Sequence, residues 1–289
     1  MMILNDRLPV IKNIEECANS GDFYKKVELN DPQFSDEQLR EINEKYLQNK
    51  DSITYKLKRN IAVLFAKIFT RKINKDTEVL GVEKIPKDIG GFIITSNHFG
   101  PLENTVIRRL INKFGRNKLN IISQTSNFGM KGFIGFLMNY ADTIPISNDP
   151  RYLARDFLAL LKEKLVIKKE AVLLYPEQEM WFNYRKPRPP KNGAYYFAAK
   201  LNVPIVSCFI EIKDLDEDES PEFKKTAYVL HVLDVLYPDE KLTSKENVES
   251  LSNRDYALKK ACYESVYKKP LEYTFNNEDI AGWKGVRDE

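Results

Sequence analysis

The sequence has little cysteine and histidine. The three cysteines, Cys17, Cys208 and Cys262, are scattered and form no C-x-x-C pair, which argues against a disulfide scaffold and fits a reducing compartment. There are only two histidines, so a site built from several imidazole ligands is a poor hypothesis. We therefore expect no metal site.

Long apolar runs are also missing. The longest clean run, residues 61–66, is far shorter than the roughly 20 residues that cross a bilayer, so we expect no membrane-spanning segment. The first residues lack the basic stretch and apolar run of a signal peptide, which predicts a cytoplasmic protein. Net charge is only +3, which argues against a nucleic-acid partner.

The composition is otherwise that of a folded protein. With 289 residues, 43% hydrophobic and 30% charged, the chain can bury a sizeable core, and it shows no repeat or low-complexity tract. Disordered and fibrous classes are excluded. We expect two parts: an arm with a helical hairpin over residues 1–77, and an αβ domain with a polar tail over residues 78–289. Oligomeric state cannot be read from the sequence.

The hairpin holds two predicted helices. Residues 1–34 are expected to form an irregular arm or short helices, and Ser35 is a predicted N-cap for a helix that ends near residue 48. A second helix follows Asp51, and its apolar residues fall on one helical stripe: Leu57, Ile61, Leu64, Phe65, Ile68 and Phe69. Its charge is entirely basic from residue 56 to 75: Lys56, Lys58, Arg59, Lys67, Arg71, Lys72 and Lys75. Two interpretations stand side by side, because such a helix can lie on an anionic lipid surface or pack on its own domain.

From residue 78 onward, short apolar runs alternate with helical patterns. Buried strands are predicted at residues 92–95, 119–122, 171–174 and 204–206. Helices are predicted at residues 102–114, 128–138, 151–164 and 194–201, followed by an acidic loop at 214–222, a strand at 226–236 and a closing helix at 253–268. This alternation predicts an α/β fold with a mixed, largely parallel central sheet flanked by helices.

One histidine lies where chemistry gathers in such a sheet. His98 comes directly after the first predicted strand, and Glu103 follows five residues later at the start of a predicted helix. A carboxylate that accepts a hydrogen bond from one ring nitrogen fixes the tautomer and makes the other nitrogen a general base. Spacing alone also fits a hydrogen-bonded structural histidine, and His231, inside a strand pattern, fits that second description better.

A second cluster follows the strand that ends near Tyr175. If the sheet is parallel, this strand brings Glu177 and Gln178 to the same edge as His98. Four cations then crowd a proline-rich segment: Arg185, Lys186, Arg188 and Lys191. Guanidinium groups on a rigid segment suit a phosphate or phosphopantetheine group, although a solvated basic loop would look the same.

Taken together, these stretches resemble the glycerolipid acyltransferases, the lysophosphatidic acid acyltransferase or PlsC-type family. NHFGPLE at residues 97–103 is similar to the family's N-H-x4-D signature. YPEQ at residues 175–178, followed by NGA, AAK and VPIV, is similar to its F-P-E-G block and later elements, and TIPI at 143–146 to its second block. The blocks keep the family's order over about residues 78–236, and three ordered blocks are far more specific than one.

The resemblance implies acyl transfer from a thioester of coenzyme A or acyl carrier protein to a lipid hydroxyl, without a cofactor, by a protein peripheral to the inner face of the cell membrane. His98 would be the general base and Glu103 would replace the orienting aspartate. Residues expected to bind substrate are Asn97, Arg151, Glu177, Gln178, Arg185, Lys186, Arg188 and Lys191. The helices before residue 78 would be the membrane-docking element.

The sequence also departs from the family pattern. The third block continues with Gln178, Glu179 and Met180 where the family has Gly-Thr-Arg, and Asn148 stands where the second block has an arginine. Either the cations at 185–188 relocate the anion site or the acceptor is another lipid or glycolipid alcohol. A non-catalytic lipid-binding protein on the same scaffold remains the main alternative, and a hydrolase with a His-Glu pair is a weaker one.

Overall fold

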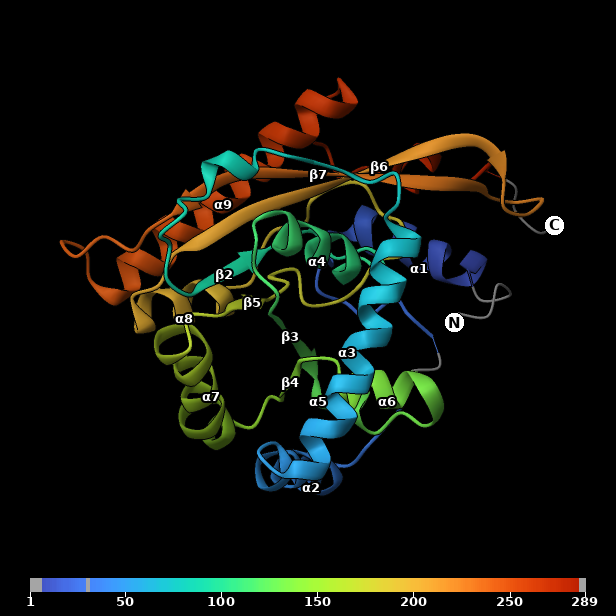
Figure 1. Ribbon diagram of the computed structural model, residues 1–289. Helices are drawn as coiled ribbons and strands as arrows, with labels where there is room; N and C mark the ends of the chain where they lie inside the picture. Colours follow the sequence, from blue (N-terminus) through green and yellow to red (C-terminus); the bar gives the residue numbers. More distant parts are fainter. Residues whose placement is uncertain (1–6, 30–31, 286–289) are drawn as a thin grey trace.

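The computed structural model describes residues 7–29 and 32–285, which form a seven-stranded sheet flanked by helices (Figure 1). The strand order is β1-β7-β6-β2-β5-β3-β4, and every neighbouring pair is parallel except β6 and β7. The strands are β1 (Glu78–Leu80), β2 (Phe92–Thr95), β3 (Leu119–Gln124), β4 (Thr143–Ile146), β5 (Ala171–Leu173), β6 (Ile205–Asp218) and β7 (Lys224–Leu236). The predicted fold class, a mixed and largely parallel sheet, is confirmed.

Helices cover both faces of the sheet. The α-helices of the described residues are α1 (Arg7–Ser20), α2 (Asp36–Asn49), α3 (Ile53–Ile73), α4 (Asn104–Lys113), α5 (Thr125–Phe128), α6 (Gly132–Tyr140), α7 (Leu158–Lys162), α8 (Gly193–Leu201) and α9 (Ser244–Tyr267). Adjacent residues of β2 point to opposite faces: Phe92 and Ile94 pack with α4, and Ile93 packs with α7 and α8. All of β2 is buried, which is why its first three residues are apolar and the polar side chain of Thr95 is hydrogen-bonded to Asp255 at 3.0 Å.

Some predicted boundaries are wrong. The acidic stretch expected to be a loop at residues 214–222 continues β6 to Asp218, and only a short turn follows before β7 begins at Lys224. This end of the hairpin is exposed, so it needs no apolar side chains, and charged pairs such as Lys225 with Glu217 (2.6 Å) join the two strands instead. The arm before residue 35 contains a full helix, α1.

Helix α1 belongs to the same body as the site segment. Val10, Ile11 and Ile14 share an apolar cluster with Trp181 and Ile280, near the C-terminal end of the chain. The N-terminal residues therefore pack against parts of the chain that lie far away in sequence.

Helix α3 lies along the outside of the molecule and is fastened at two points. Arg59 donates to Asp142, the residue before β4, at 2.6 Å, and Asn74, which caps α3, donates to Thr105 in the first turn of α4 at 2.7 Å. Part of the predicted apolar stripe packs on the protein, since Phe65 and Phe69 both contact Phe133 of α6.

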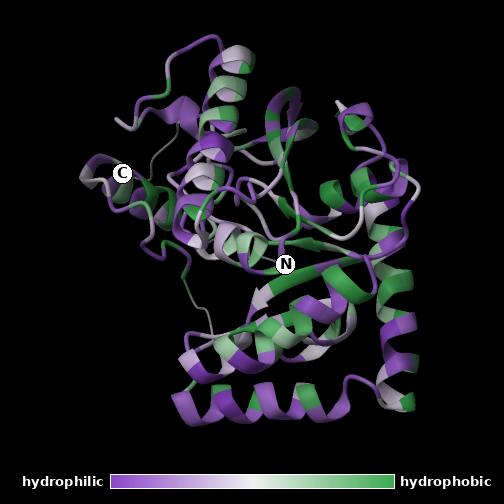
Figure 2. Ribbon diagram, turned by 90° about the vertical axis from the view of Figure 1, so that its left-hand side faces the viewer, coloured by the Kyte–Doolittle hydropathy of each residue, from purple (hydrophilic) through white to green (hydrophobic). Residues whose placement is uncertain are grey.

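The rest of that stripe faces solvent. Its other four members, together with Ile53, which the predicted stripe did not include, lie three or four residues apart on α3 and are between 50% and 79% exposed: Ile53, Leu57, Ile61, Leu64 and Ile68. Figure 2 shows green and purple alternating along α3, at the right-hand edge of that view. We call these five residues the apolar ridge. Within the described part of the chain, no helix is both long and apolar enough to span a bilayer.

Candidate active site

His98 lies on the loop that joins β2 to α4, at the carboxyl end of the central strand. The loop is anchored by Asn97, whose side chain donates to the carbonyl of Ile210 on β6 at 3.0 Å and accepts from the amide of the same residue at 2.8 Å. Asn97 is 1% exposed. Its amide group is thus used inside the fold, and it fixes the position of the next residue rather than facing a substrate.

The imidazole of His98 and the carboxylate of Glu103 form a hydrogen-bonded pair through Nδ1 and Oε1. The other carboxylate oxygen, Oε2, accepts from the backbone amides of Phe99 (2.5 Å) and Gly100 (2.8 Å). Because the carboxylate is held by these amides and directly precedes α4, its negative charge is stabilised where it stands. The Glu103 side chain is 1% exposed, and that of His98 is 20% exposed.

This arrangement sets the tautomer of His98. An ionised carboxylate can only accept, so Nδ1 carries the proton and the lone pair is on Nε2. Nε2 has no hydrogen-bonding partner among the residues that the structure describes. The amides of Phe99 and Gly100 are occupied by Glu103 and therefore cannot also hold an oxyanion. What the pair offers is a general base with a fixed orientation.

Tyr175 supports the imidazole from one face. The two rings are stacked with their centroids 4.1 Å apart and their planes 7° from parallel. Burial, reinforced by the nearby Glu103 carboxylate, raises the pKa of the Tyr175 hydroxyl well above its ordinary value, so this residue is neutral in the folded protein. Stacking on one face and the carboxylate at one edge together leave His98 little rotational freedom.

A buried ion pair supports the backbone of the loop that contains His98. Glu177 accepts from the backbone amide of His98 at 3.1 Å, and its carboxylate is also bound by the side chain of Arg188 at 3.0 Å. Arg188 further donates to the carbonyls of Phe23 and Glu179 and lies 4.5 Å from the ring of Trp181. The segment after β5 is joined to the His98 loop a second time, because the amide of Trp181 donates to the carbonyl of His98 at 3.1 Å.

The part of the chain that contains this site matches a model of a known protein family. Residues 76–211, which include His98, Glu103 and Glu177, match the family model Acyltransferase. This segment is similar to that family. The resemblance predicted from the sequence motifs is thereby confirmed for this segment.

The chain was also compared with solved structures and with curated proteins. Among solved structures, the chain is similar to the crystal structure of the 1-acyl-sn-glycerophosphate (LPA) acyltransferase, PlsC, from Thermotoga maritima. The two share 17% identity with a TM-score of 0.45, and the alignment covers 88% of this chain and 97% of that one. No curated protein matches the sequence.

The structure does not bring the predicted cations together to form an open anion site. Lys186 is buried and paired with Asp279 at 2.6 Å, and Arg185 is paired with Asp214 and donates to the carbonyl of Glu278. With Arg188 bound to Glu177, all three charges are matched inside the fold. The expected anion site at residues 185–188 is therefore not formed.

The remaining predicted residues are all exposed at the surface. Lys191 is exposed and sits over the ring of Tyr24 at 3.8 Å. Gln178 is exposed in the left-handed region, with φ of 64°, and Arg151 is exposed near the start of the helical segment after β4. Among the described residues, no group of three or more histidine, cysteine, aspartate or glutamate side chains could hold a metal ion.

Sequence reasoning missed two contributors. Tyr175 was expected to end a strand and begin the YPEQ motif but was given no role in the site, although an aromatic residue two positions before Glu177 is placed to meet the imidazole across parallel strands. Trp181 was not singled out at all, and it packs fully buried against Arg188. The cluster of Tyr175, Glu177 and Trp181 in seven residues was the available signal.

Proposed function

We propose that this protein transfers a fatty acyl group from a thioester of coenzyme A or acyl carrier protein to a hydroxyl of a lysoglycerolipid or related lipid alcohol. The observation that carries this proposal is the His98–Glu103 pair within the segment that matches the Acyltransferase family model, with Nδ1 engaged and Nε2 without a partner among the described residues. No serine or cysteine within the motif could serve as a nucleophile, so the hydroxyl of the acceptor is the nucleophile.

In this mechanism Nε2 of His98 takes the hydroxyl proton as the acceptor oxygen attacks the thioester carbonyl. The resulting imidazolium is stabilised by Glu103, whose own carboxylate stays ionised. The tetrahedral intermediate collapses by breaking its carbon–sulfur bond. The thiolate leaves and takes up the proton from Nε2, which restores the neutral imidazole, and the acyl group stays on the acceptor oxygen.

We further propose that the protein works at the inner face of the cell membrane as a peripheral protein. The apolar ridge of α3 supports this, because exposed apolar side chains at helical spacing, bordered by cations, suit insertion into an anionic interface. Phe133 and Ile134 of α6 extend the exposed apolar surface beside it. Such a surface would bring the site to a lipid acceptor that never leaves the bilayer.

The acceptor need not carry a phosphate that binds to cations of the third block, the segment that begins with YPEQ. The cations available there, Arg185, Lys186 and Arg188, are paired with Asp214, Asp279 and Glu177. This favours recognition of the acceptor mainly through its hydroxyl and its acyl chain, and it keeps lipid alcohols without a phosphate among the substrates.

The test is to incubate the pure protein with several acyl thioesters and a mixed cellular lipid extract, and to search by mass spectrometry for a lipid heavier by one acyl group. His98→Gln is the paired variant, because it keeps a polar side chain but has no base. A new acylated lipid with the wild type and none with His98→Gln supports the proposal. Neither transfer nor release of free thiol would instead favour a lipid-binding protein on this scaffold.

A further inference from the structure

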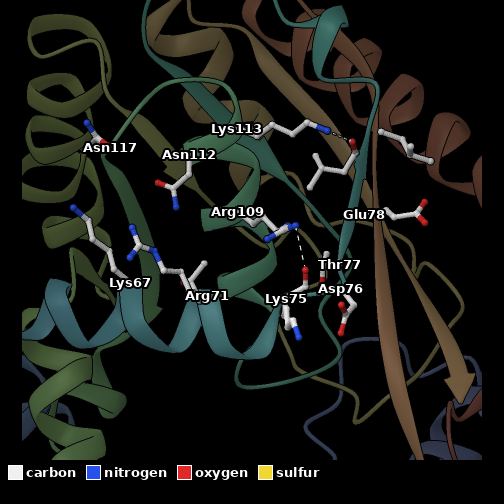
Figure 3. A pocket seen from close by; sticks show the side chains of 13 residues that line it. Lys67, Arg71, Lys75, Asp76, Thr77, Glu78, Arg109, Asn112, Lys113 and Asn117 are labelled. Atoms are coloured by element: carbon white, nitrogen blue, oxygen red, sulfur yellow. Dashed lines mark hydrogen bonds between the residues drawn. The ribbon is translucent and has the colours of Figure 1, made fainter.

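A groove lies between α3 and α4, and neither His98 nor Glu103 lines it. It is bounded by the last turns of α3, the connection from α3 to β1, and α4, and its volume is about 890 Å3, within the range of about 300 to 1,000 Å3 that ligand sites occupy. Figure 3 shows the side chains that line it. We call it the α3–α4 groove.

Its lining is strongly cationic. Five cations line it, Lys67, Arg71, Lys75, Arg109 and Lys113, against two acids, Asp76 and Glu78. The cations come in rows one helical turn apart, Lys67 and Arg71 on α3 and Arg109 and Lys113 on α4, which places them on the facing sides of two helices. In Figure 3 the two acids lie together at the β1 end, apart from Lys67 and Arg71.

The cations of α3 are uncommitted. Throughout residues 7–29 and 32–285, none of the five cations forms an ion pair, although Arg109 and Lys113 donate to the backbone carbonyls of Lys75 and Val79. Lys67 and Arg71 make no side-chain hydrogen bond either, within the same residues. Neighbouring like charges repel one another, so binding of an anion between these cations would lower their electrostatic energy.

The position of the groove indicates which anion. Lys67 and Arg71 directly flank Leu64 and Ile68 of the apolar ridge, so both features belong to one helix surface. If the ridge enters the interface, these cations come to the depth of the lipid phosphates. Basic recesses beside membrane-facing helices are suited to anionic headgroups, and each cation contributes about 1 kcal/mol near an anionic surface.

We propose that the α3–α4 groove binds the headgroup of an anionic membrane phospholipid, distinct from the acceptor in the His98 site. This inference rests on the membrane-surface role proposed above. The bound headgroup would hold α3 in one orientation on the membrane, which insertion of the ridge alone would not define.

The experiment uses a water-soluble lipid so that binding does not depend on membrane docking. The full-length protein is titrated with dihexanoyl phosphatidylglycerol below its micelle concentration, with dihexanoyl phosphatidylcholine, coenzyme A and inorganic phosphate as comparison ligands, by calorimetry. The groove variant is Lys67→Gln with Arg71→Gln. The matched control is Lys56→Gln with Lys72→Gln, which removes the same charge from the same helix at exposed positions outside the groove.

We expect the wild type, the control pair and His98→Gln to bind phosphatidylglycerol equally and phosphatidylcholine not measurably. The groove variant should bind at least tenfold more weakly, because it loses two of the five cations. Equal weakening in the two pairs would mean general electrostatic attraction only and would overturn the proposal. So would loss of binding in His98→Gln, or tighter binding of coenzyme A or free phosphate with the same variant sensitivity.

The calorimetric titration measures lipid binding and does not depend on turnover. A protein that never transfers an acyl group but binds phosphatidylglycerol in the groove would refute the proposed function and leave this inference standing. An active protein whose groove binds no anionic lipid would do the reverse.

Discussion

Replacing Glu103 by glutamine should disable the base without removing it. In the wild type Oε2 accepts two backbone amides and Oε1 accepts from Nδ1 of His98. A glutamine must keep its side-chain oxygen toward the amides of Phe99 and Gly100. If its NH2 group pointed there instead, hydrogen-bond donors would face each other and the two backbone amides would lose their acceptor. The NH2 group then faces Nδ1, which can only accept from it, so the ring proton moves to Nε2.

The consequence for catalysis is large. With the proton on Nε2, the prevailing tautomer has no lone pair toward the acceptor hydroxyl, and only the minor tautomer reacts. A wrong tautomer in a comparable His-acid arrangement costs about 10⁴-fold in turnover, and here we expect a loss of about 10³- to 10⁴-fold, or about 4 to 5 kcal/mol of barrier. Glu103→Asp keeps the charge on a shorter side chain and should fall between the wild type and Glu103→Gln.

Two readouts check this. Turnover is followed by thiol release from an acyl thioester in the presence of acceptor. The tautomer is read from the ring-nitrogen NMR shifts of 15N-histidine-labelled protein, which is practical because the chain has only two histidines. The spectrum of Glu103→Gln should show Nε2 protonated and Nδ1 unprotonated.

The chain supplies a matched control in its other His-acid pair. His231 and Glu211 face each other across β6 and β7 at 2.9 Å, with similarly limited exposure. Glu211→Gln should alter the His231 signals and leave acyl transfer at the wild-type level. Wild-type turnover in Glu103→Gln, or an unchanged His98 tautomer, would refute the reasoning.

Four further outcomes follow from the same contacts. Arg188→Met leaves the Glu177 carboxylate buried and unpaired and should lower the free energy of unfolding by about 3 to 5 kcal/mol in urea titrations, whereas exposed Lys191→Met should change it by less than about 0.5 kcal/mol. Tyr175→Leu removes the ring stacked on His98 and should lower kcat about 10- to 100-fold, while Tyr175→Phe keeps the ring and should stay near wild type; equal losses would exclude stacking as the cause. Leu64→Asp on the apolar ridge should reduce sedimentation with anionic vesicles at least tenfold without lowering the melting temperature, and unchanged sedimentation would remove α3 from the docking surface. Partial burial opposes ionisation of Glu163, but the hydrogen bond from Lys168 and the charges of Lys164 and Lys50 prevail and lower its pKa from 4.5 to about 2. Its ionised form therefore contributes stability above pH 4.5 that is lost as the pH falls toward 2, so the destabilisation caused by Glu163→Gln should shrink over that window in acid-titrated melting curves and is contradicted by a constant difference.

The parts of the structure that were predicted correctly are those that depend on local sequence patterns. The runs at β2 and β5 are buried on both faces, so their apolar character alone marks them as central strands. His98 and Glu103 are five residues apart on one loop, so a short turn can pair them, although long-range contacts with Ile210, Glu177 and Trp181 hold that loop in place. The parallel sheet, once inferred, also placed Glu177 beside His98.

Long-range pairing explains what was not predicted. Lys186 meets Asp279, 93 positions away, and a cluster of cations in a proline-rich segment looks the same from sequence whether its counter-ions belong to a substrate or to the distant end of the chain. Glu177 illustrates the same ambiguity, because the carboxylate expected to face the acceptor is used to hold the amide of His98. The length of β6 was missed for a different reason: its outer half is charged and exposed, so it carries no apolar alternation.

The hydrogen bond between Asn74 and Thr105 couples two regions that would otherwise be treated separately. Thr105 is two residues from Glu103, and Asn74 is the C-cap of α3, so a displacement of the end of α3 would be transmitted to the first turn of α4 and to the Glu103 carboxylate. A shortened protein that lacks residues 1–76 would therefore differ from the full-length protein by more than the loss of the proposed docking surface. It would leave Thr105 without this donor and loosen the first turn of α4, and any drop in its turnover would mix lost docking with a displaced Glu103.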